Sequence, residues 1–353
     1  MSSFAHLHVH TEYSMLDGAA RVADFVAEVA RQEMPAIAMT DHGNVFGAFD
    51  FYKQAKKVGV KPIIGIEAYV APESRFEKKR VKWADGGEDD VSGGGAYTHM
   101  TILAENNEGL SNLFRLSSLA SLEGYYYKPR MDRGLLTQYS KGLIATTGCP
   151  GGEIQTRLRM GAFKEAMAAA SDYRDIFGRD NFFLEIMDHG IDIESRVKAD
   201  LLKLGKELGL PLLATNDLHY TFHEDARSHE ALLCVQSGST LADPKRFKFD
   251  NDSFYVKTPA QMRELFKDIP ESCDNTLLIA ERCDVTMREN ENLLPQFSVP
   301  AGESEDSWLK KEAVRGMKER LGEKLTPAHE SRLDYELGVM EKMGFPGYFL
   351  VVA

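Results

Sequence analysis

The stretch FAHLHVHTEYSMLDG, residues 4–18, places a histidine at every second position of an apolar run. Side chains two residues apart on a β-strand point to the same face of a sheet. The spacing therefore predicts a strand over residues 5–10, with His6, His8 and His10 on one face and the apolar side chains on the other. His6 lies deepest in this strand and is open to a purely structural role. His8 and His10 lie near its end and are candidate metal ligands.

Six further short apolar runs follow, with amphipathic helical patterns between them. They occupy residues 35–40, 61–70, 99–105, 142–148, 181–187 and 211–217. Repeated alternation of strand and helix is typical of a parallel sheet covered by helices. Seven such units favour a closed seven-stranded α/β barrel over an open sheet. The functional face of such a barrel lies at the C-terminal ends of its strands.

The alternation is interrupted once and later fades. Residues 71–98 lack clear periodicity, and a loop of this length is uncommon unless it has a function, so we interpret them as an insertion. Its basic run is either a solvated face or a phosphate contact: Lys78, Lys79, Arg80 and Lys82. We expect one domain over residues 1–285. Residues 286–353 are expected to be a linker and the truncated start of a second domain, because the chain stops inside the apolar run GYFLVVA.

The composition limits the classes of function. The 353 residues carry a net charge of -12, whereas a protein that simply wraps DNA is usually basic. A nucleic-acid role must therefore rest on a local site, such as one that carries metal cations. The four cysteines form no CxxC pair, which favours a reducing cytoplasmic location over a disulfide framework. No apolar run approaches the roughly 20 residues of a membrane-spanning helix, so no membrane partner is expected.

Metal-capable side chains recur at the predicted strand ends. Besides His8 and His10, they are Asp17, His42, Glu67, Cys149, Asp217 and His219. Taken singly, each has an ordinary structural explanation, since an aspartate can cap a helix and a cysteine can fill a core. Their convergence on one end of a barrel instead predicts a polynuclear site for Zn²⁺, Mn²⁺ or Fe²⁺. Cysteine and imidazole ligands argue against a pure Mg²⁺ site.

One further histidine fits this scheme less well. His99 begins its apolar run instead of ending it. In a strictly parallel barrel this position lies at the end opposite to the other candidates. Either the 71–98 insertion folds back, or the strand that contains His99 starts later or runs differently.

These motifs resemble the polymerase and histidinol phosphatase (PHP) family of metal-dependent phosphoesterases. They include HLHVHTEYSMLDG, TDHGNVFGAFDFYKQA, KPIIGIEAYV, GCPGGEI, FFLEIMDHG and ATNDLHY. In series, the motifs are similar to the N-terminal domain of the alpha subunits of bacterial replicative DNA polymerase III. The tail GFPGYFLVVA is similar to the start of the palm domain in those subunits. The resemblance implies a distorted seven-stranded barrel, like a TIM barrel, that binds up to three metal ions.

The resemblance also implies nine metal ligands: His8, His10, Asp17, His42, Glu67, His99, Cys149, Asp217 and His219. In the family pattern one metal is held by a group that we expect to be catalytic: His8, His10, Glu67 and Asp217. A second metal is held by Glu67, His99 and Cys149, with Glu67 bridging. A third is held by Asp17, His42 and His219. Every one of these positions carries a metal-capable residue here, which implies an active domain.

The resulting hypothesis is a zinc-dependent 3′–5′ exonuclease that proofreads the 3′ end of a DNA primer-template. Clustered divalent metals suit phosphodiester hydrolysis because they lower the pKa of water and neutralise charge on phosphoryl oxygens. Lys128 and Arg130 either hold substrate phosphate or belong to a solvated loop. His189, next to Asp188, is predicted to contact the substrate or to support the ligands. The parent protein is expected to be a DNA-directed DNA polymerase whose catalytic aspartates lie beyond residue 353, with a sliding clamp and clamp loader as partners.

Two alternatives stay open at this point. The barrel could be a zinc-stabilised scaffold that docks a separate proofreading subunit, in which case the metal contributes folding free energy and little catalysis. It could also be a stand-alone phosphomonoesterase that acts on small molecules and ignores DNA ends. The intact ligand set disfavours the first alternative, and the palm-like tail disfavours the second.

Overall fold

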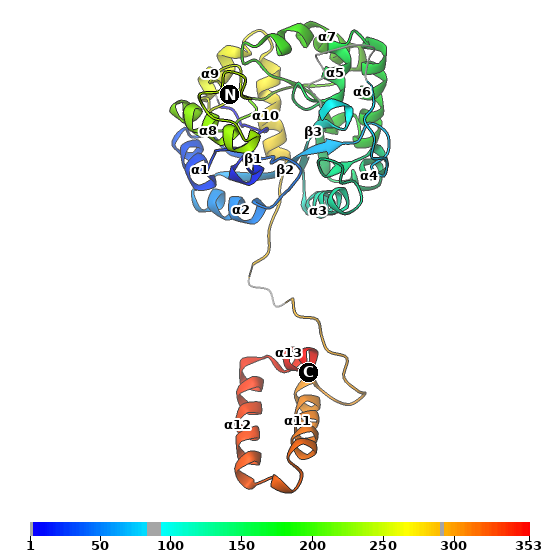
Figure 1. Ribbon diagram of the computed structural model, residues 1–353, viewed down its shortest axis with the longest axis vertical. Coiled ribbons are helices and arrows are strands. Elements are labelled where there is room, and N and C mark those ends of the chain that lie inside the picture. Colours follow the sequence, from blue (N-terminus) through cyan, green and yellow to red (C-terminus); the bar gives the residue numbers. More distant parts are fainter. Residues whose placement is uncertain (1–2, 83–92, 290–292) are drawn as a thin grey trace. The chain divides into compact units, whose positions relative to one another are not determined.

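The computed structural model describes residues 3–82, 93–289 and 293–353, and within them seven strands form one curled sheet (Figure 1). The strands are β1 (Ala36–Met39), β2 (Lys61–Val70), β3 (Thr98–Ala104), β4 (Arg130–Met131), β5 (Leu143–Thr146), β6 (Phe182–Ile186) and β7 (Leu212–Ala214). The sheet runs in the order β1-β2-β3-β5-β6-β7, and β4 pairs with β2. Nearly all strand residues are buried, as expected for a sheet covered on both faces.

The N-terminal segment joins the two ends of this sheet. The backbone N–H of Ala38 donates to the carbonyl of His6 at 2.9 Å, and the N–H of His10 donates to the carbonyl of Leu218 at 2.7 Å. The segment therefore pairs with β1 on one side and with the chain after β7 on the other, which closes a distorted barrel. The six-residue strand predicted over 5–10 is wrong in detail, because the segment forms only isolated bridges.

The predicted common face of the three histidines is also wrong. The backbone bends at His8, so the strict alternation breaks there. Leu7 packs in the inner apolar cluster of the barrel, whereas Val9 packs in the outer cluster beneath the helices. The ring of His6 turns away, with Nε2 2.9 Å from the carbonyl oxygen of Lys257. His6 is thus a buried structural residue, separate from the other two histidines.

Strand β3 runs against its neighbours. It pairs antiparallel with both β2 and β5, whereas β1–β2, β5–β6 and β6–β7 are parallel pairs. The sheet is therefore not parallel at this strand, which agrees with one alternative left open for His99, that its strand runs differently. The reversal brings the start of β3 to the same end of the barrel as the carboxyl ends of the parallel strands. His99, the second residue of β3, lies at that end.

Helices surround the sheet in the first compact unit, Met1–Met287 (Figure 1). They are α1 (Val22–Arg31), α2 (Ala48–Lys57), α3 (Asn107–Leu122), α4 (Arg133–Tyr139), α5 (Glu153–Arg159), α6 (Phe163–Phe177), α7 (Asp192–Leu208), α8 (Ala226–Ser237), α9 (Pro259–Leu265) and α10 (Pro270–Arg282). Helix α1 buries Val22, Phe25, Val26 and Val29 along one face, as an amphipathic helix does. Helix α10 contributes Ile279 to the inner cluster.

The second compact unit, Arg288–Ala353, contains α11 (Glu305–Leu321), α12 (Pro327–Met343) and α13 (Pro346–Val352). Pro stands at the start of α12 and α13, where its missing N–H is not needed. Residues 290–292 of the predicted linker lie outside the described residues. None of the described helices in either unit combines the length and apolar character that crossing a bilayer requires.

Buried Arg130 helps to tie the predicted insertion to the barrel. Its residues 83–92 lie outside the described part of the chain. On the described flanks, the buried guanidinium of Arg130 donates to the carbonyls of Arg75, Glu77 and Ala96, and to that of Gly124, at 2.9 to 3.1 Å. The side chain is 0% exposed. The prediction that Arg130 holds substrate phosphate is therefore wrong: it holds the backbone of the insertion.

We expect Arg130→Met to destabilise the first unit. It leaves buried carbonyls without donors, each costing about 1–3 kcal/mol, so the expected loss is about 3 kcal/mol or more in the free energy of unfolding. Denaturant unfolding followed by circular dichroism measures it. The control is Arg115→Met, an exposed arginine on α3, which should change stability by less than about 0.5 kcal/mol. Equal stability of the two variants would contradict the anchoring role.

Candidate metal centre

The carboxylate of Glu67 lies at the centre of a cluster of imidazoles. Glu67 projects from β2 and is 1% exposed. Its Oε1 lies 2.9 Å from His99 Nδ1 and 3.4 Å from His8 Nε2. Its Oε2 lies 2.5 Å from His42 Nδ1 and 3.4 Å from His10 Nε2. A single buried carboxylate thus faces four histidines from three separate parts of the chain.

Asp217 brings a second carboxylate to the same histidines from the turn after β7. Its Oδ1 lies 3.2 Å from His10 Nε2 and 3.5 Å from His8 Nε2. The residue has a φ of 42°, a left-handed conformation that is uncommon outside glycine, although aspartate adopts it more readily than most residues. Such strain persists where the surroundings impose it, and it concentrates at functional sites.

A third carboxylate, Asp17, lies in the loop that leads to α1. Its Oδ2 lies 2.9 Å from His42 Nε2 and 3.1 Å from His219 Nε2. The loop is held in place by His229, whose Nε2 lies 2.7 Å from the carbonyl oxygen of Asp17. Asp17 therefore does not cap a helix, since α1 begins only at Val22 and its N-cap is Arg21.

Cys149 completes the cluster on the side of the reversed strand. Its Sγ lies 3.2 Å from Glu67 Oε1 and 3.5 Å from His99 Nδ1. The antiparallel direction of β3 is what lets His99 reach this end of the barrel. The structure therefore brings together all nine side chains singled out in the sequence.

Several buried polar atoms at the centre lie within ion-pair distance of one another but make no hydrogen bond of regular geometry: His8 Nε2, His10 Nε2, His42 Nδ1, Glu67 Oε2 and Asp217 Oδ1. Buried polar atoms are normally satisfied, so such a concentration needs an explanation. Three sets of side chains can be distinguished, and within each set the ligand atoms lie within 4.8 Å of one another. They are His8 with His10 and Asp217; His42 with Glu67 and His99; and His10 with Asp17, His42 and His219. Imidazole, carboxylate and thiol donors at these spacings fit metal cations such as Zn²⁺.

The electrostatics of the cluster also favour cations. Burial would raise the pKa of Glu67, but its interactions with the imidazoles of His99, His42 and His8 lower that pKa well below its usual range. Burial, followed by the neighbouring His42 and His219, lowers the pKa of His10 to about 3 and keeps its ring neutral. Burial and then Glu67 raise the pKa of the Cys149 thiol. A bound cation reverses this last effect, because a coordinated thiol is deprotonated.

Sequence reasoning missed Glu185, which lies beneath His8. Its Oε1 is 2.6 Å from His8 Nδ1, so that Nε2 of the same ring faces Glu67 and Asp217. Three threonine hydroxyls donate to the Glu185 carboxylate: those of Thr101, Thr146 and Thr215. The signal was available, because Glu185 is an acid inside the apolar run FFLEI of β6, as Glu67 is inside β2.

His189 supports the centre from behind and is not placed for substrate contact. It is 5% exposed, with Nδ1 2.6 Å from Glu194 and Nε2 2.8 Å from the carbonyl oxygen of Asn216. Lys257 Nζ donates to the side chain of Asn216 at 2.7 Å. These contacts fix the residue that precedes Asp217, and they correct the predicted contact between His189 and substrate.

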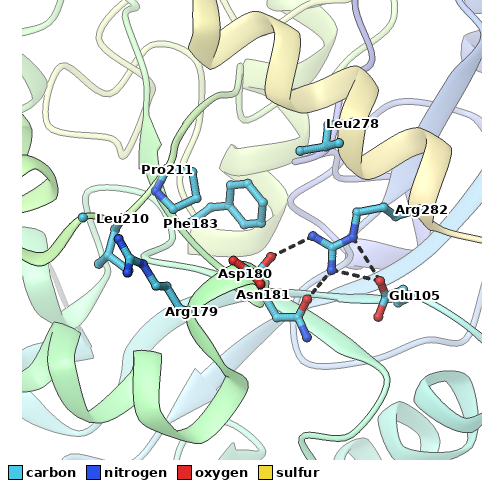
Figure 2. Close-up of a pocket in the computed structure, with 10 residues that line it drawn as sticks. Glu105, Arg179, Asp180, Asn181, Phe183, Leu210, Pro211, Leu278 and Arg282 are labelled. Atoms are coloured by element: carbon cyan, nitrogen blue, oxygen red, sulfur yellow. Dashed lines mark hydrogen bonds and ion pairs between the residues drawn. The ribbon is translucent and has the colours of Figure 1, made fainter.

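The cluster opens into a hollow of about 470 Å³ that is also lined by Lys128, Phe247 and Phe249. A larger hollow of about 830 Å³ lies at the opposite end of the barrel, where β3 ends and where β6 and β7 begin (Figure 2). There Arg282 pairs with Glu105 at 2.9 Å and donates to the carbonyl of Asp180 and to Asn181. That end therefore holds a structural ion pair, and the candidate centre lies at the functional end expected for α/β barrels.

Comparison with protein-family models bears on this geometry. A model described as the PHP domain matches residues 6–189. The chain belongs to the PHP domain family. A second model, described as the bacterial DNA polymerase III alpha NTPase domain, matches residues 307–353. The two matches lie in the first and second compact units of this PHP protein, respectively.

Relatives of this PHP protein confirm the resemblance seen in its motifs. It is 56% identical over 361 residues to the DNA polymerase III subunit alpha of Saccharopolyspora erythraea. This match covers 99% of the present chain and 30% of that protein. It is 41% identical over 410 residues to the same subunit of Thermus aquaticus, at 99% and 33% coverage. The chain thus spans about a third of the length of these relatives.

A solved structure from Bacteroides vulgatus was also matched. It is a two-domain protein described as containing a predicted PHP-like metal-dependent phosphoesterase. The identity is 13%, the match covers 80% of this chain and 69% of that one, and the TM-score is 0.36.

We expect Glu185→Gln to weaken metal binding. The amide cannot hold the His8 ring as the carboxylate does, and loss of such a supporting partner typically costs 10–100-fold in metal affinity. Competition with a chromogenic chelator of known zinc affinity measures the change. Glu153→Gln is the matched control, because Glu153 is a buried carboxylate that contacts Arg133, Arg157 and Tyr173, none of which is a candidate ligand. An unchanged affinity in Glu185→Gln, with the control also unchanged, would show that Glu185 does not position His8.

Proposed function

We propose that the PHP domain of this chain is a metal-dependent 3′–5′ exonuclease acting on DNA ends, within a bacterial DNA polymerase III alpha subunit. The observation that supports it most is the convergence of nine metal-capable side chains at one end of the barrel, with orphaned buried donor atoms between them. The identity to alpha subunits over the whole chain supports the parent protein. Polymerisation, the sliding clamp, the clamp loader and the cytoplasmic setting are proposals for that parent.

The ligand assignments are part of this proposal. His8, His10 and Asp217 would hold one cation with Glu67, and Glu67 would bridge to a second held by His99 and Cys149. Asp17, His42 and His219 would hold the third. The mixed donor set suits Zn²⁺, with Mn²⁺ or Fe²⁺ as alternatives. When bound, such cations supply Lewis-acid stabilisation of a phosphoryl group and lower the pKa of water.

The chain's own residues prepare the centre for this chemistry. The negative carboxylates of Glu67 and Asp217 offset the charge of the cations. The neutral ring of His10 leaves its Nε2 free to bind. Lys128 lines the same hollow and places a positive charge at its wall. A phosphate that enters the hollow would therefore be attracted both by Lys128 and by the bound cations.

We expect the wild-type chain to shorten an end-labelled primer with a 3′ mismatch in single-nucleotide steps. Asp217→Asn should reduce this rate about 100-fold or more, the scale on which loss of a charge-stabilising group acts, and a chelator should abolish it. Asp268→Asn, at an exposed aspartate, is the matched control. Metal content is measured on the same samples.

The other outcomes of this assay separate the alternatives. Turnover of a small phosphomonoester without shortening of DNA would contradict the exonuclease and favour a phosphatase. Bound metal without turnover of either substrate would favour a scaffold. Shortening at the same rate by Asp217→Asn would identify a contaminating nuclease.

Metal binding is also expected to stabilise the barrel, because the ligands lie on both sides of the backbone pairing that closes it. His8 and His10 belong to the N-terminal segment, and Asp217 and His219 belong to the chain after β7. A cation present at 100 times its dissociation constant adds about 2.7 kcal/mol. We therefore expect chelation to lower the unfolding temperature of the wild type by about 5–10 °C. Calorimetry measures this shift, which should be much smaller in Asp217→Asn. An equal shift in both would place the stabilising metal elsewhere.

A further inference from the structure

A long segment without helix or strand borders the candidate metal centre. It connects the end of α8 at Ser237 to the start of α9 at Pro259, and it contains the sequence KRFKF at residues 245–249. Connections of this length are uncommon in compact domains unless they have a function. Basic and aromatic residues interleave in KRFKF, a combination used by surfaces that bind single-stranded nucleic acid.

Aromatic rings lead from the centre along this segment to the solvent. The ring of Phe249 lies 4.7 Å from that of His219 and 4.8 Å from that of His229, edge to face in both cases. The ring of Phe247 lies 6.2 Å from Phe249 and is 55% exposed. Phe249 is thus fixed against the metal centre, and Phe247 presents an apolar ring at the mouth of the hollow.

Two hollows meet at this segment. The first, of about 470 Å³, contains the candidate ligands and is bordered by Phe247 and Phe249. The second, of about 640 Å³, shares Phe249 and is lined by Arg246 and Lys248, with Arg227 also on its wall. A strand whose end enters the first hollow can therefore continue along Phe249 into the second.

Positive charge lies on both walls of this path. Lys248 is exposed on the segment. Across the first hollow, Lys128 Nζ lies 5.5 Å from the centre of the Tyr69 ring, which in turn stacks on His42 at 5.7 Å. Acidic groups are present too, but Glu230 is paired with Arg246, and Asp252 with His223. Asp243 and Asp250 flank the KRFKF run in sequence.

We propose that the segment Lys245–Phe249 is the binding surface for the single-stranded 3′ end of DNA. The ring of Phe247 stacks on a base near the end, and Lys248 and Lys128 contact phosphates on either side of it. A single strand fits better than a duplex, because the faces of paired bases are covered by their neighbours and cannot stack on a side chain. The inference rests on the proposed exonuclease function and adds the path by which its substrate reaches the metal centre.

The test measures DNA binding separately from hydrolysis. The wild-type chain is titrated against a fluorescently labelled single-stranded oligonucleotide whose 3′ phosphorothioate linkages slow cleavage, and against the blunt duplex of the same sequence. The variants are Phe247→Ala and Lys248→Ala. Their matched controls are Phe114→Ala, at a partly exposed phenylalanine on α3, and Lys164→Ala, at an exposed lysine on α6. Metal content is measured for every protein.

We expect Phe247→Ala to weaken single-strand binding about tenfold, as loss of one stacked base does. Lys248→Ala should reduce by about 1 the slope of log affinity against log salt concentration. Both control variants should bind within about twofold of the wild type. Single-strand binding by Phe247→Ala at the wild-type level would overturn the proposal, as would equally tight binding of the blunt duplex by the wild type. Failure of the wild type to shorten unmodified DNA would contradict the exonuclease alone, since the binding comparison stands independently.

Discussion

A buried carboxylate surrounded by imidazoles is the constraint on which this domain depends. Glu67 is 1% exposed in the middle of the apolar strand β2, and an ionised group in such a place costs several kcal/mol unless opposite charge compensates it. The compensation comes from His8, His42 and His99, which belong to distant parts of the chain. Their positions require a closed barrel with one reversed strand. Fold and charge balance are therefore two aspects of the same arrangement.

Much of this arrangement could be predicted from the sequence, because it rests on short-range patterns. Apolar runs of strand length predicted β1, β2, β3, β5, β6 and β7 within a few residues of their observed bounds. Glu67 stood out as an acid inside an apolar run, and pairs such as Asp217 and His219 stood out at a strand end. The family resemblance added His99, whose geometry the pattern alone left open.

The features that escaped prediction depend on long-range contacts. Periodicity says nothing about strand direction, so the reversal of β3 was only one of the alternatives that the position of His99 left open. The bend at His8 is imposed by pairing with two partners at once. Arg130 looked like a phosphate ligand because a motif does not show burial, and its acceptors include the carbonyl of Arg75, 55 residues away. Glu185 is visible as an acid inside an apolar run, but its role depends on contact with His8, 177 positions earlier.

The pairing between the N-terminal segment and the chain after β7 has a consequence for how the domain is synthesised. Asp17 and His219 are in contact beside this pairing, yet 202 positions separate them in the chain. Synthesis on the ribosome begins at the N-terminus. His8 and His10 are therefore synthesised long before their partner Asp217. Contacts between such distant residues carry a high loop-closure cost and form slowly. The centre is consequently completed late, because a nascent chain shorter than about this length lacks Asp217 and His219.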